Sequence, residues 1–314
     1  MKLATSDMIS KIDDYSETKL GIPVSELMYK SGLAVAKAVR ETVALKKCVV
    51  ILAGKGNNGG DGYAAALNLI DEYDVTVYDV FSGGQNSDSG RYFLSAFLER
   101  GGRVVDFSPR ADVLSHIKNS DCIVDAIFGT GFHGEMPEGI KALARTVTDA
   151  PDAVRIAIDV PLGVNADDGS VSESAISADV TVALSYIKPG IISYPAREYT
   201  GRIIYDGLGL PSEQIEDAFS FKYSMIDSEW VKNNLPNRKE NSNKGTFGKL
   251  LVLTGSRKYR GAAHLSLEAA LRGGVGLVNF AGCDELVSEL SQKYPETIYT
   301  KTKETGEFTE EDTE

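Results

Sequence analysis

Residues 46 to about 206 alternate between two patterns of hydrophobic positions. Short, β-branched and almost continuously apolar runs predict strands that are buried on both faces. They are Cys48–Ala53, Val75–Phe81, Arg103–Phe107, Cys122–Ile127, Arg155–Val160, Val180–Ser185 and Arg202–Tyr205. Segments with helical spacing lie between most of them: Tyr63–Ile70, Gly90–Arg100, Ala111–Lys118 and Gly139–Thr148. The alternation predicts an α/β fold with a mostly parallel sheet and helices on both faces.

Two helices are expected before the first strand. They span Ser6–Leu20 and Ser25–Val43, and the break Gly21-Ile22-Pro23 separates them. Ser25 is the expected N-cap of the second helix, because a serine hydroxyl accepts an otherwise free N–H of the first turn. Apolar residues at helical spacing give that helix its buried face: Leu27, Met28, Leu33, Val35, Ala36 and Val39.

A second, incomplete unit is expected after a linker. Residues 216–242 are polar and turn-rich, and predict the linker between a first domain, 1–215, and a segment at 243–303. That segment holds one strand–helix–strand pattern, namely Lys249–Thr254, Ala262–Arg272 and Val275–Phe280. One such unit cannot bury a sheet face alone, so we expect it to be poorly packed or to depend on a missing partner. Residues 304–314 carry six acids and no base, and predict a disordered tail.

Composition excludes several classes of protein. The 314 residues are 42% hydrophobic and 25% charged, which is enough for a core and excludes global disorder. The net charge of −12 argues against a nucleic-acid partner. The chain has no apolar stretch of 18 residues and no apolar region at its start, so we expect a cytoplasmic protein without a membrane partner. Three cysteines cannot form a disulfide framework.

The sharpest chemical signal is the segment from Gly54 to Gly62, GKGNNGGDG. It follows an expected strand and precedes an expected helix. Its five glycines leave backbone N–H groups accessible, and the helix N-terminus behind them carries about half a positive charge. The segment therefore predicts a cradle for an anion or a nucleotide.

Two other nucleotide-binding loops must be weighed against this one. The segment matches G-x-G-x-x-G, and Asp79 could supply the ribose-binding acid of a nicotinamide dehydrogenase. However, the charge of Asp61 inside the cradle would repel a pyrophosphate. Asp61 is better suited to accept hydrogen bonds from ribose hydroxyls or to stabilise the helix start. A phosphate-binding P-loop is excluded, because no Gly-Lys-Ser/Thr closes the segment.

Two further loops predict the same site. Asp125 ends a strand ahead of the glycine-rich loop Gly129–Glu135, and Asp159 ends another strand ahead of the turn Pro161-Leu162-Gly163. The carboxyl ends of parallel strands line the ligand crevice, so the three loops should converge. His133 has no partner at the spacing of metal ligands.

These segments resemble a known family. The string Asn57-Asn58-Gly59-Gly60-Asp61-Gly62, the Asp125 loop and the Asp159 turn are similar to the YjeF N-terminal domain family, the NAD(P)H-hydrate epimerases, as are the opening helices. The resemblance covers about residues 1–215 and implies a Rossmann-like three-layer α/β/α sheet. The segment from Asn243 to Ala263 resembles the start of an ADP-dependent NAD(P)H-hydrate dehydratase, a ribokinase-like domain.

The resemblance implies a role for each matching residue. Asp159 would be catalytic, at the reacting ring. Those that would bind the substrate, NADHX or NADPHX, are Asn57, Asn58, Gly59, Gly60, Asp61, Gly129, Thr130, Gly131, Phe132, His133, Gly134, Glu135, Asp159 and, in the second segment, Ala262. Asn58 and Asp125 match ligands of a potassium ion, and Leu162 stands where the family has a serine ligand.

The resemblance implies an isomerase acting in the repair of nicotinamide nucleotides. ADP or ATP with Mg²⁺ would be needed only if the dehydratase domain were complete. Two alternatives stay open: a non-catalytic nucleotide-binding scaffold of the same fold, and an NAD-dependent dehydrogenase. A homodimer, or a missing dehydratase remainder, is the expected protein partner.

Overall fold

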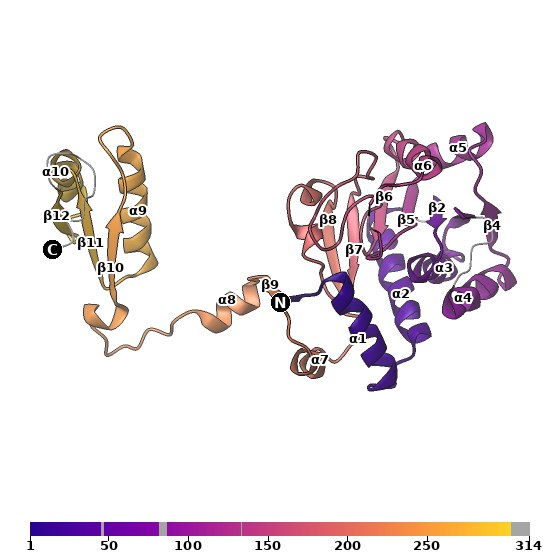
Figure 1. The fold of residues 1–314 in the computed structure, drawn as a ribbon, viewed down its shortest axis with the longest axis horizontal. Helices are drawn as coiled ribbons and strands as arrows, with labels where there is room; N and C mark the ends of the chain where they lie inside the picture. The colour runs from indigo at the N-terminus through magenta and orange to yellow at the C-terminus, as the bar shows by residue number, and fades with distance from the viewer. Residues whose placement is uncertain (45–46, 82–86, 133, 303–314) are drawn as a thin grey trace. The chain divides into compact units, whose positions relative to one another are not determined.

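The computed structural model describes residues 1–44, 47–81, 87–132 and 134–302. The chain divides into two compact units, Met1–Trp230 and Val231–Glu314 (Figure 1). His133 and the acidic tail 304–314, both singled out from the sequence, lie outside the described residues.

The first unit is built on a seven-stranded sheet in which every neighbouring pair is parallel. The strand order is β4-β3-β2-β5-β6-β7-β8. The strands are β2 (Cys48–Ala53), β3 (Asp74–Asp79), β4 (Arg103–Asp106), β5 (Cys122–Ala126), β6 (Val154–Ile158), β7 (Val180–Leu184) and β8 (Arg202–Asp206). From β2 the chain runs outward to β3 and β4, and it then crosses to β5. The loops after β2 and β5 therefore diverge and leave a crevice at the carboxyl edge of the sheet.

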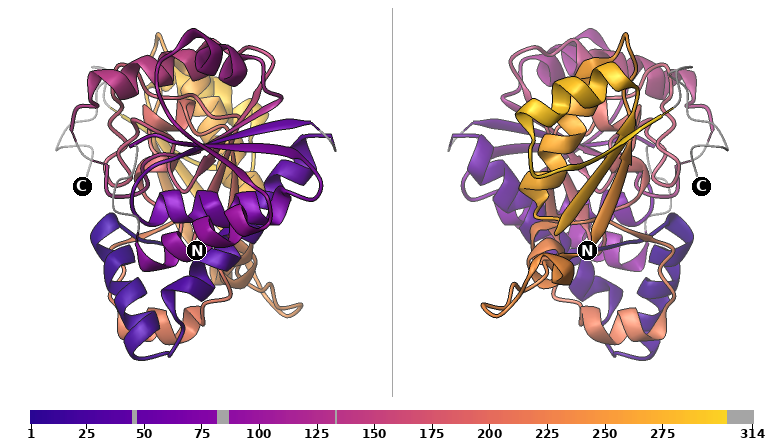
Figure 2. Two further views of the ribbon diagram at one scale, coloured as in Figure 1. Left: turned by 90° about the vertical axis from the view of Figure 1, so that its right-hand side faces the viewer. Right: turned by 90° about the vertical axis from the view of Figure 1, so that its left-hand side faces the viewer.

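Helices cover both faces of this sheet (Figures 1 and 2). The helices α2 (Val24–Thr42), α3 (Asn57–Leu69) and α4 (Asp88–Glu99) share one apolar core with the sheet. A second core lies under α5 (Ala111–Lys118) and α6 (Glu138–Thr148). Alternate residues of β2 enter the two cores, because successive side chains of a strand point to opposite faces. The predicted three-layer α/β/α fold is confirmed.

The start of α2 differs from the sequence prediction. Pro23 is the N-cap, without a side-chain hydrogen bond, and Ser25 lies inside the first turn rather than capping it. The fixed φ of proline favours a chain entering a helix here. The predicted apolar face of α2 is buried except for Leu33, which is 38% exposed.

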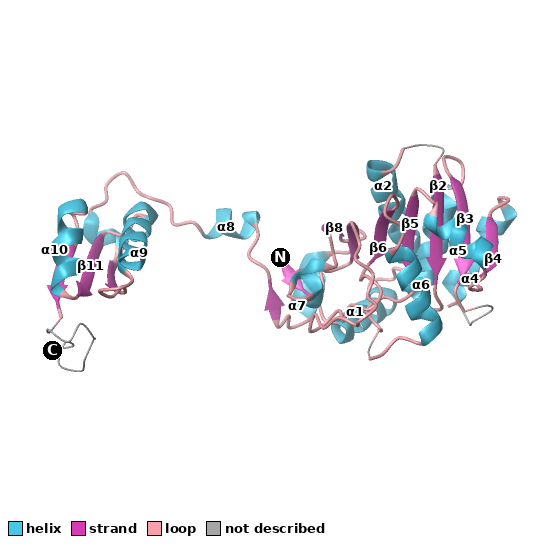
Figure 3. Ribbon diagram, turned by 90° about the horizontal axis from the view of Figure 1, so that it is seen from above, coloured by secondary structure: helices cyan, strands magenta, loops and turns pink. Residues whose placement is uncertain are grey.

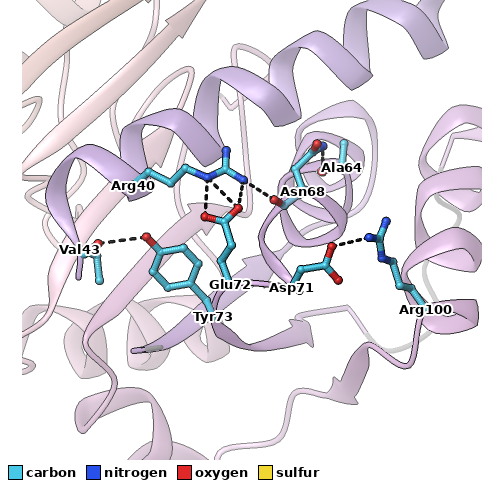
Figure 4. A network of polar contacts seen from close by, with 8 residues as sticks. All are labelled: Arg40, Val43, Ala64, Asn68, Asp71, Glu72, Tyr73 and Arg100. Carbon is cyan, nitrogen blue, oxygen red and sulfur yellow. Dashed lines mark hydrogen bonds and ion pairs between the residues drawn. The ribbon is translucent and has the colours of Figure 1, made fainter. Parts of the chain in front are cut away.

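A polar network holds α2 against the end of α3 (Figure 4). The Arg40 Nε donates to Glu72 at 3.0 Å, and its Nη2 donates to the Asn68 carbonyl at 2.7 Å. The Tyr73 hydroxyl donates to the Val43 carbonyl at 3.1 Å. The network fixes the C-terminal part of α2. The Arg40 guanidinium donates through two nitrogens, so it constrains the geometry more than a single exposed ion pair would.

The first unit extends past residue 215. Ile215 of α7 (Ser212–Ala218) is fully buried in a cluster with Ile9 and Ile12 of α1 (Ser6–Thr18). The ring of Phe219 meets that of Tyr15 edge-on at 5.4 Å. The predicted linker therefore begins too early, because its first residues are needed to hold α1.

Two short strands complete the first unit. β9 (Tyr223–Ser224) pairs antiparallel with β1 (Lys2–Leu3). Two 3-10 helices, η1 (Gly190–Ile192) and η2 (Ala196–Glu198), connect β7 to β8. The helix α8 (Ser228–Asn234) spans the division between the units.

None of the described helices is long and apolar enough to cross a membrane.

The second unit, taken by itself, is a three-stranded parallel sheet with two helices (Figure 3). Its elements are η3 (Lys244–Phe247), β10 (Lys249–Leu253), α9 (Arg260–Gly273), β11 (Leu277–Gly282), α10 (Asp284–Lys293) and β12 (Ile298–Lys301). Both helices and one face of the sheet form a single buried cluster. The expectation of poor packing is therefore wrong for this face, because α10 and β12, which the sequence analysis missed, help to close it.

The other face of the small sheet is open. Leu251, Asn279 and Ile298 are paired across the three strands and so lie on one face. Leu251 is 56% exposed, Leu253 49% and Ile298 50%. No helix or loop among the described residues covers this face of the sheet.

Candidate functional site

A cavity of about 170 Å³ opens at the carboxyl ends of the central strands of the first unit. Its walls come from α1, α2, the start of α3 and the loops that follow β5, β6, β7 and β8. The polar residues that line it are Asp13, Ser31, Asn57, Asn58, Asp61, Thr130, Asp159, Ser185 and Lys188. The three loops predicted to converge therefore do so, with α1 and α2 added to them.

Backbone strain is concentrated in this cavity. Asp159, Ser185 and Leu208 have φ values of 66°, 60° and 53°, and they are the non-glycine residues with positive φ among those described. All three line the cavity. Such a conformation costs of the order of 1–3 kcal/mol per residue and persists where the surrounding structure enforces it. The strain makes this cavity the candidate functional site.

Asp159 and Lys188 form a buried ion pair in the wall of the cavity. The Lys188 ammonium contacts the Asp159 Oδ1 and donates to the Leu184 carbonyl at 2.8 Å, and its side chain is 1% exposed. The Leu184 N–H donates to the same carboxylate oxygen at 3.1 Å. One oxygen of Asp159 therefore accepts both a charge-assisted contact and a backbone hydrogen bond. The site therefore presents a carboxylate that can accept a proton.

Two other carboxyl groups in the cavity favour the protonated form. Burial raises the pKa of Asp61 well above its usual range, and the nearby Asp159 charge raises it further. Burial also raises the pKa of Asp13 to about 6, although Lys188 opposes this. The Lys188 ammonium thus lies among three carboxyl groups, and it forms its ion pair with Asp159. The cavity combines a proton acceptor with a proton donor, the arrangement needed for acid–base chemistry near pH 7.

The glycine-rich loop is the start of a helix rather than a free cradle. The helix α3 begins at Asn57, so the helix predicted from Tyr63 starts earlier. Its first N–H groups have no carbonyl partner within the helix and remain able to bind an anion. Asn57 and Asn58 line the cavity, whereas Gly59 and Gly60 are buried and do not.

The glycines of this loop serve close packing. A Cβ at Gly59 would lie 1.8 Å from the Gly54 carbonyl oxygen, and one at Gly60 would lie 2.5 Å from the Met28 side chain. Gly56 has a φ of 94°, which a glycine adopts readily. The expectation that Gly60 is needed for backbone contact with a ligand is therefore not supported, because Gly60 faces the protein interior.

A pair of alanine substitutions tests this packing role. Gly54→Ala should lower the free energy of unfolding by about 2–3 kcal/mol, since its Cβ would lie 1.8 Å from the Ile127 carbonyl oxygen. Gly131→Ala is the matched control, because nothing lies within 4 Å of a Cβ there. Urea unfolding of both variants measures the difference. Equal stability would contradict the packing argument.

The second glycine-rich loop contributes only its first part to the cavity. Gly129 and Thr130 line it. The Thr130 carbonyl accepts a hydrogen bond from the Ser6 hydroxyl at 3.0 Å, which ties this loop to α1. Phe132 stacks on Phe128 with ring centroids 5.4 Å apart and packs on the core. The remaining predicted contacts that the structure describes, Gly131, Gly134 and Glu135, are exposed and do not line this cavity.

The residues predicted to hold potassium fit a cation in part. Asp125 is 2% exposed, and its carboxylate accepts N–H groups from Leu162 at 2.7 Å and from Ile127 at 3.2 Å. Burial raises its pKa to about 6, and no cationic side chain contributes to that shift. The Asn58 amide nitrogen is buried without a hydrogen-bond partner, and turning the amide would place an oxygen there. A buried carboxylate and an amide oxygen suit a hard cation.

Leu162 fits this role less well. Its side chain is fully buried in the core under α5 and α6, and its carbonyl already accepts the Ile176 N–H at 2.9 Å. Its contribution to the site is the N–H that it donates to Asp125. Among the described residues there is also no group of three His, Cys, Asp or Glu side chains that could hold a metal ion.

Ala262, the last of the predicted contacts, belongs to the second unit. It is exposed on α9. A small hollow of that unit, at the ends of β10 and β11, is lined by Leu253, Thr254, Gly255, Ala281, Gly282, Cys283 and Thr302, and Ala262 does not border it.

Sequence reasoning missed two side chains that shape the cavity. Lys188 was not singled out, although a lysine among apolar residues and before Pro189-Gly190, just after a buried strand, is an unusual place for a charge. Asp13 lies in the first of the two opening helices, and the sequence assigned it no role of its own. Its position on α1, far from the loops in sequence, gave no sign that it would reach them.

Asp13 makes a pH-dependent contribution to stability. Its pKa in the folded protein is about 6, above the ordinary value of 3.8. The carboxyl group therefore stabilises the fold below about pH 4, and this contribution is lost as the pH rises through 6. Asp13→Asn should raise the free energy of unfolding at pH 8 by about 2 kcal/mol and leave it unchanged at pH 4. Asp14→Asn, at the exposed neighbouring position, is the control. Equal gains at both pH values would contradict the assignment.

Comparisons with known proteins agree with this site and fold. The model of the family described as YjeF-related protein N-terminus matches residues 24–190. The bifunctional NAD(P)H-hydrate repair enzyme Nnr of Dictyoglomus turgidum is 30% identical over 309 residues, which cover 97% of this chain and 59% of that protein. The enzyme of the same name from Escherichia coli is 31% identical over 280 residues, covering 89% of this chain and 53% of that one.

This chain thus spans little more than half the length of these relatives. A crystal structure of the yeast protein ynu0 has the same fold, with a TM-score of 0.60 and 24% identity, and covers 73% of this chain and 98% of its own. Since the family model spans more than half of the sequence, the chain belongs to the family of the YjeF-related protein N-terminus.

Proposed function

We propose that the unit Met1–Trp230 is an epimerase that interconverts the R and S forms of a hydrated nicotinamide nucleotide, NADHX or NADPHX. The names of the relatives give NAD(P)H-hydrate as the compound that they repair. The observation that carries the proposal is the Asp159–Lys188 pair, held in a strained conformation in a cavity that also contains carboxyl groups of raised pKa.

The reaction suits a cavity of this composition. The hydrate carries a hydroxyl group on C6, beside the ring nitrogen. When that hydroxyl receives a proton, the nitrogen lone pair expels water and leaves a planar iminium ion. Water that adds to the opposite face, with loss of a proton, gives the other epimer. Asp159 is the acid–base group that we assign to this proton transfer.

Charge in the cavity also favours the intermediate. The iminium ion is positive, and the Asp159 carboxylate lines the cavity in which it would form. A pre-oriented negative charge stabilises a positive charge that develops in the transition state. The buried pair keeps the Asp159 carboxylate in place without reorganisation during the reaction.

The dinucleotide phosphates would be held by other groups. The free N–H groups at the start of α3 and the backbone at Gly129 and Thr130 lie at the rim of the same cavity. Asn58 and Asp125 would hold a potassium ion, which when bound supplies positive charge near the ligand. None of these groups needs to move a proton.

A direct assay tests the proposed function. The purified chain is incubated with one epimer of NADPHX, and the two epimers are separated by chromatography over time. We expect equilibration well above the rate of a blank without protein, since the epimers interconvert slowly by themselves. Equilibration at the blank rate, with NADHX as well as NADPHX, would refute the epimerase and leave a binding protein of the same fold.

A further inference from the structure

We propose that Asp61 is a second catalytic residue, which exchanges a proton with the C6 hydroxyl on one face of the ring while Asp159 serves the other face. This inference rests on the proposed epimerase function and deepens it. From its place in the sequence, Asp61 was expected only to accept hydrogen bonds from ribose hydroxyls or to stabilise the helix start.

The backbone around Asp61 is fixed by its neighbours. Gly60 lies against Met28 of α2, and a Cβ there would come within 2.5 Å of that side chain. Gly62 lies against Ala126 of β5, where a Cβ would come within 2.7 Å. Close packing on both sides leaves the helix little freedom, so the Asp61 side chain is held in the cavity wall.

Ser31 of α2 contributes to the surroundings of Asp61. Its hydroxyl donates to the Leu27 carbonyl at 3.0 Å. Its interaction with Asp61 lowers the pKa of that carboxyl group, whereas burial raises it and is the larger effect. Burial in the cavity wall therefore favours the protonated form of Asp61.

The charges in the cavity lead to the same protonation state. Lys188 is paired with Asp159, which leaves Asp61 without a cation of its own in the described lining of the cavity. Burial and the Asp159 charge both raise the pKa of Asp61. A neutral Asp61 also removes the repulsion that its charge would exert on a phosphate bound at the start of α3.

The proton balance of the reaction needs two such groups. In one direction the Asp61 proton passes to the C6 hydroxyl, the C6–O bond breaks and water leaves. A second water then forms a C6–O bond on the other face and gives its proton to Asp159. One proton has moved from Asp61 to Asp159, and solvent returns it before the next turnover. The reverse reaction uses the same groups with their roles exchanged.

Asp61→Asn tests the assignment, because an asparagine matches the size and neutrality of the protonated acid but cannot give up a proton. We expect kcat to fall about 100-fold or more in both directions, with little change in the Kd for NADP(H). In the wild type, kcat for the direction in which Asp61 donates should fall as high pH deprotonates it, and this limb should be absent from the variant. Asp71→Asn, in the turn that follows α3, is the control, since its carboxylate is exposed and pairs with Arg100.

The outcomes separate this inference from the proposed function. An active wild type together with an Asp61→Asn variant that keeps its kcat, but binds substrate more weakly, would show a binding role and overturn the inference alone. An inactive wild type would overturn the epimerase and the inference together. A variant that loses kcat, keeps its Kd and melts at the temperature of the wild type would support both.

Discussion

Asp159→Asn should lower the rate of epimerisation by roughly 100-fold or more, which is the usual scale for the loss of a general acid–base group. The asparagine keeps the shape of the side chain and can still accept the Leu184 N–H. It cannot take up a proton from water. The rate is measured by chromatography of the two NADPHX epimers and corrected for the spontaneous reaction. Nucleotide binding, followed by the shift in melting temperature on adding NADP(H), should persist.

The same substitution should also destabilise the protein. It leaves the Lys188 ammonium buried without its anionic partner, which costs about 3–5 kcal/mol for pairs of this kind. A double variant, Asp159→Asn with Lys188→Met, separates the two effects, because the methionine removes the buried charge. The double variant should regain stability and remain inactive. An active variant, single or double, would contradict the catalytic assignment, and a single variant as stable as the wild type would contradict the buried pair.

The central sheet could be predicted from the sequence because its strands are buried on both faces. Val49, Val50, Ile51 and Leu52 form a continuous apolar run, and each is fully buried. Glycines and aspartates directly after such runs mark the carboxyl edge of a parallel sheet, so the position of the site could also be predicted. Asp159 and Asp61 were found for this reason.

The features that could not be predicted depend on contacts between residues far apart in the sequence. Lys188 acquires its role only when the chain after β7 brings it back to Asp159. A glycine is needed at position 60 because Met28, on another helix, leaves no room there for a side chain. The first unit extends past residue 215 because Ile215 packs on α1, and a single buried residue in a polar segment leaves no periodic signal.

Dehydratase activity should be absent when this chain is assayed alone. The second unit has three strands, and one face of its sheet exposes Leu251, Leu253 and Ile298 in the part that the structure describes. The lining of its small hollow includes no carboxylate, imidazole or cationic side chain among the described residues. A nucleotide-dependent dehydration needs groups that bind phosphates and move a proton, and this unit offers neither there.

The test is to incubate the chain with ADP or ATP, Mg²⁺ and the S epimer of NADPHX, and to follow the absorbance at 340 nm, where restored NADPH absorbs. We expect no recovery above the blank. The Escherichia coli enzyme, assayed in parallel, verifies the reagents, and epimerisation by the same sample of this chain verifies that it is folded. Nucleotide-dependent recovery of NADPH by this chain alone would show that its three-stranded unit is catalytically complete, because no other chain is present to supply the missing groups.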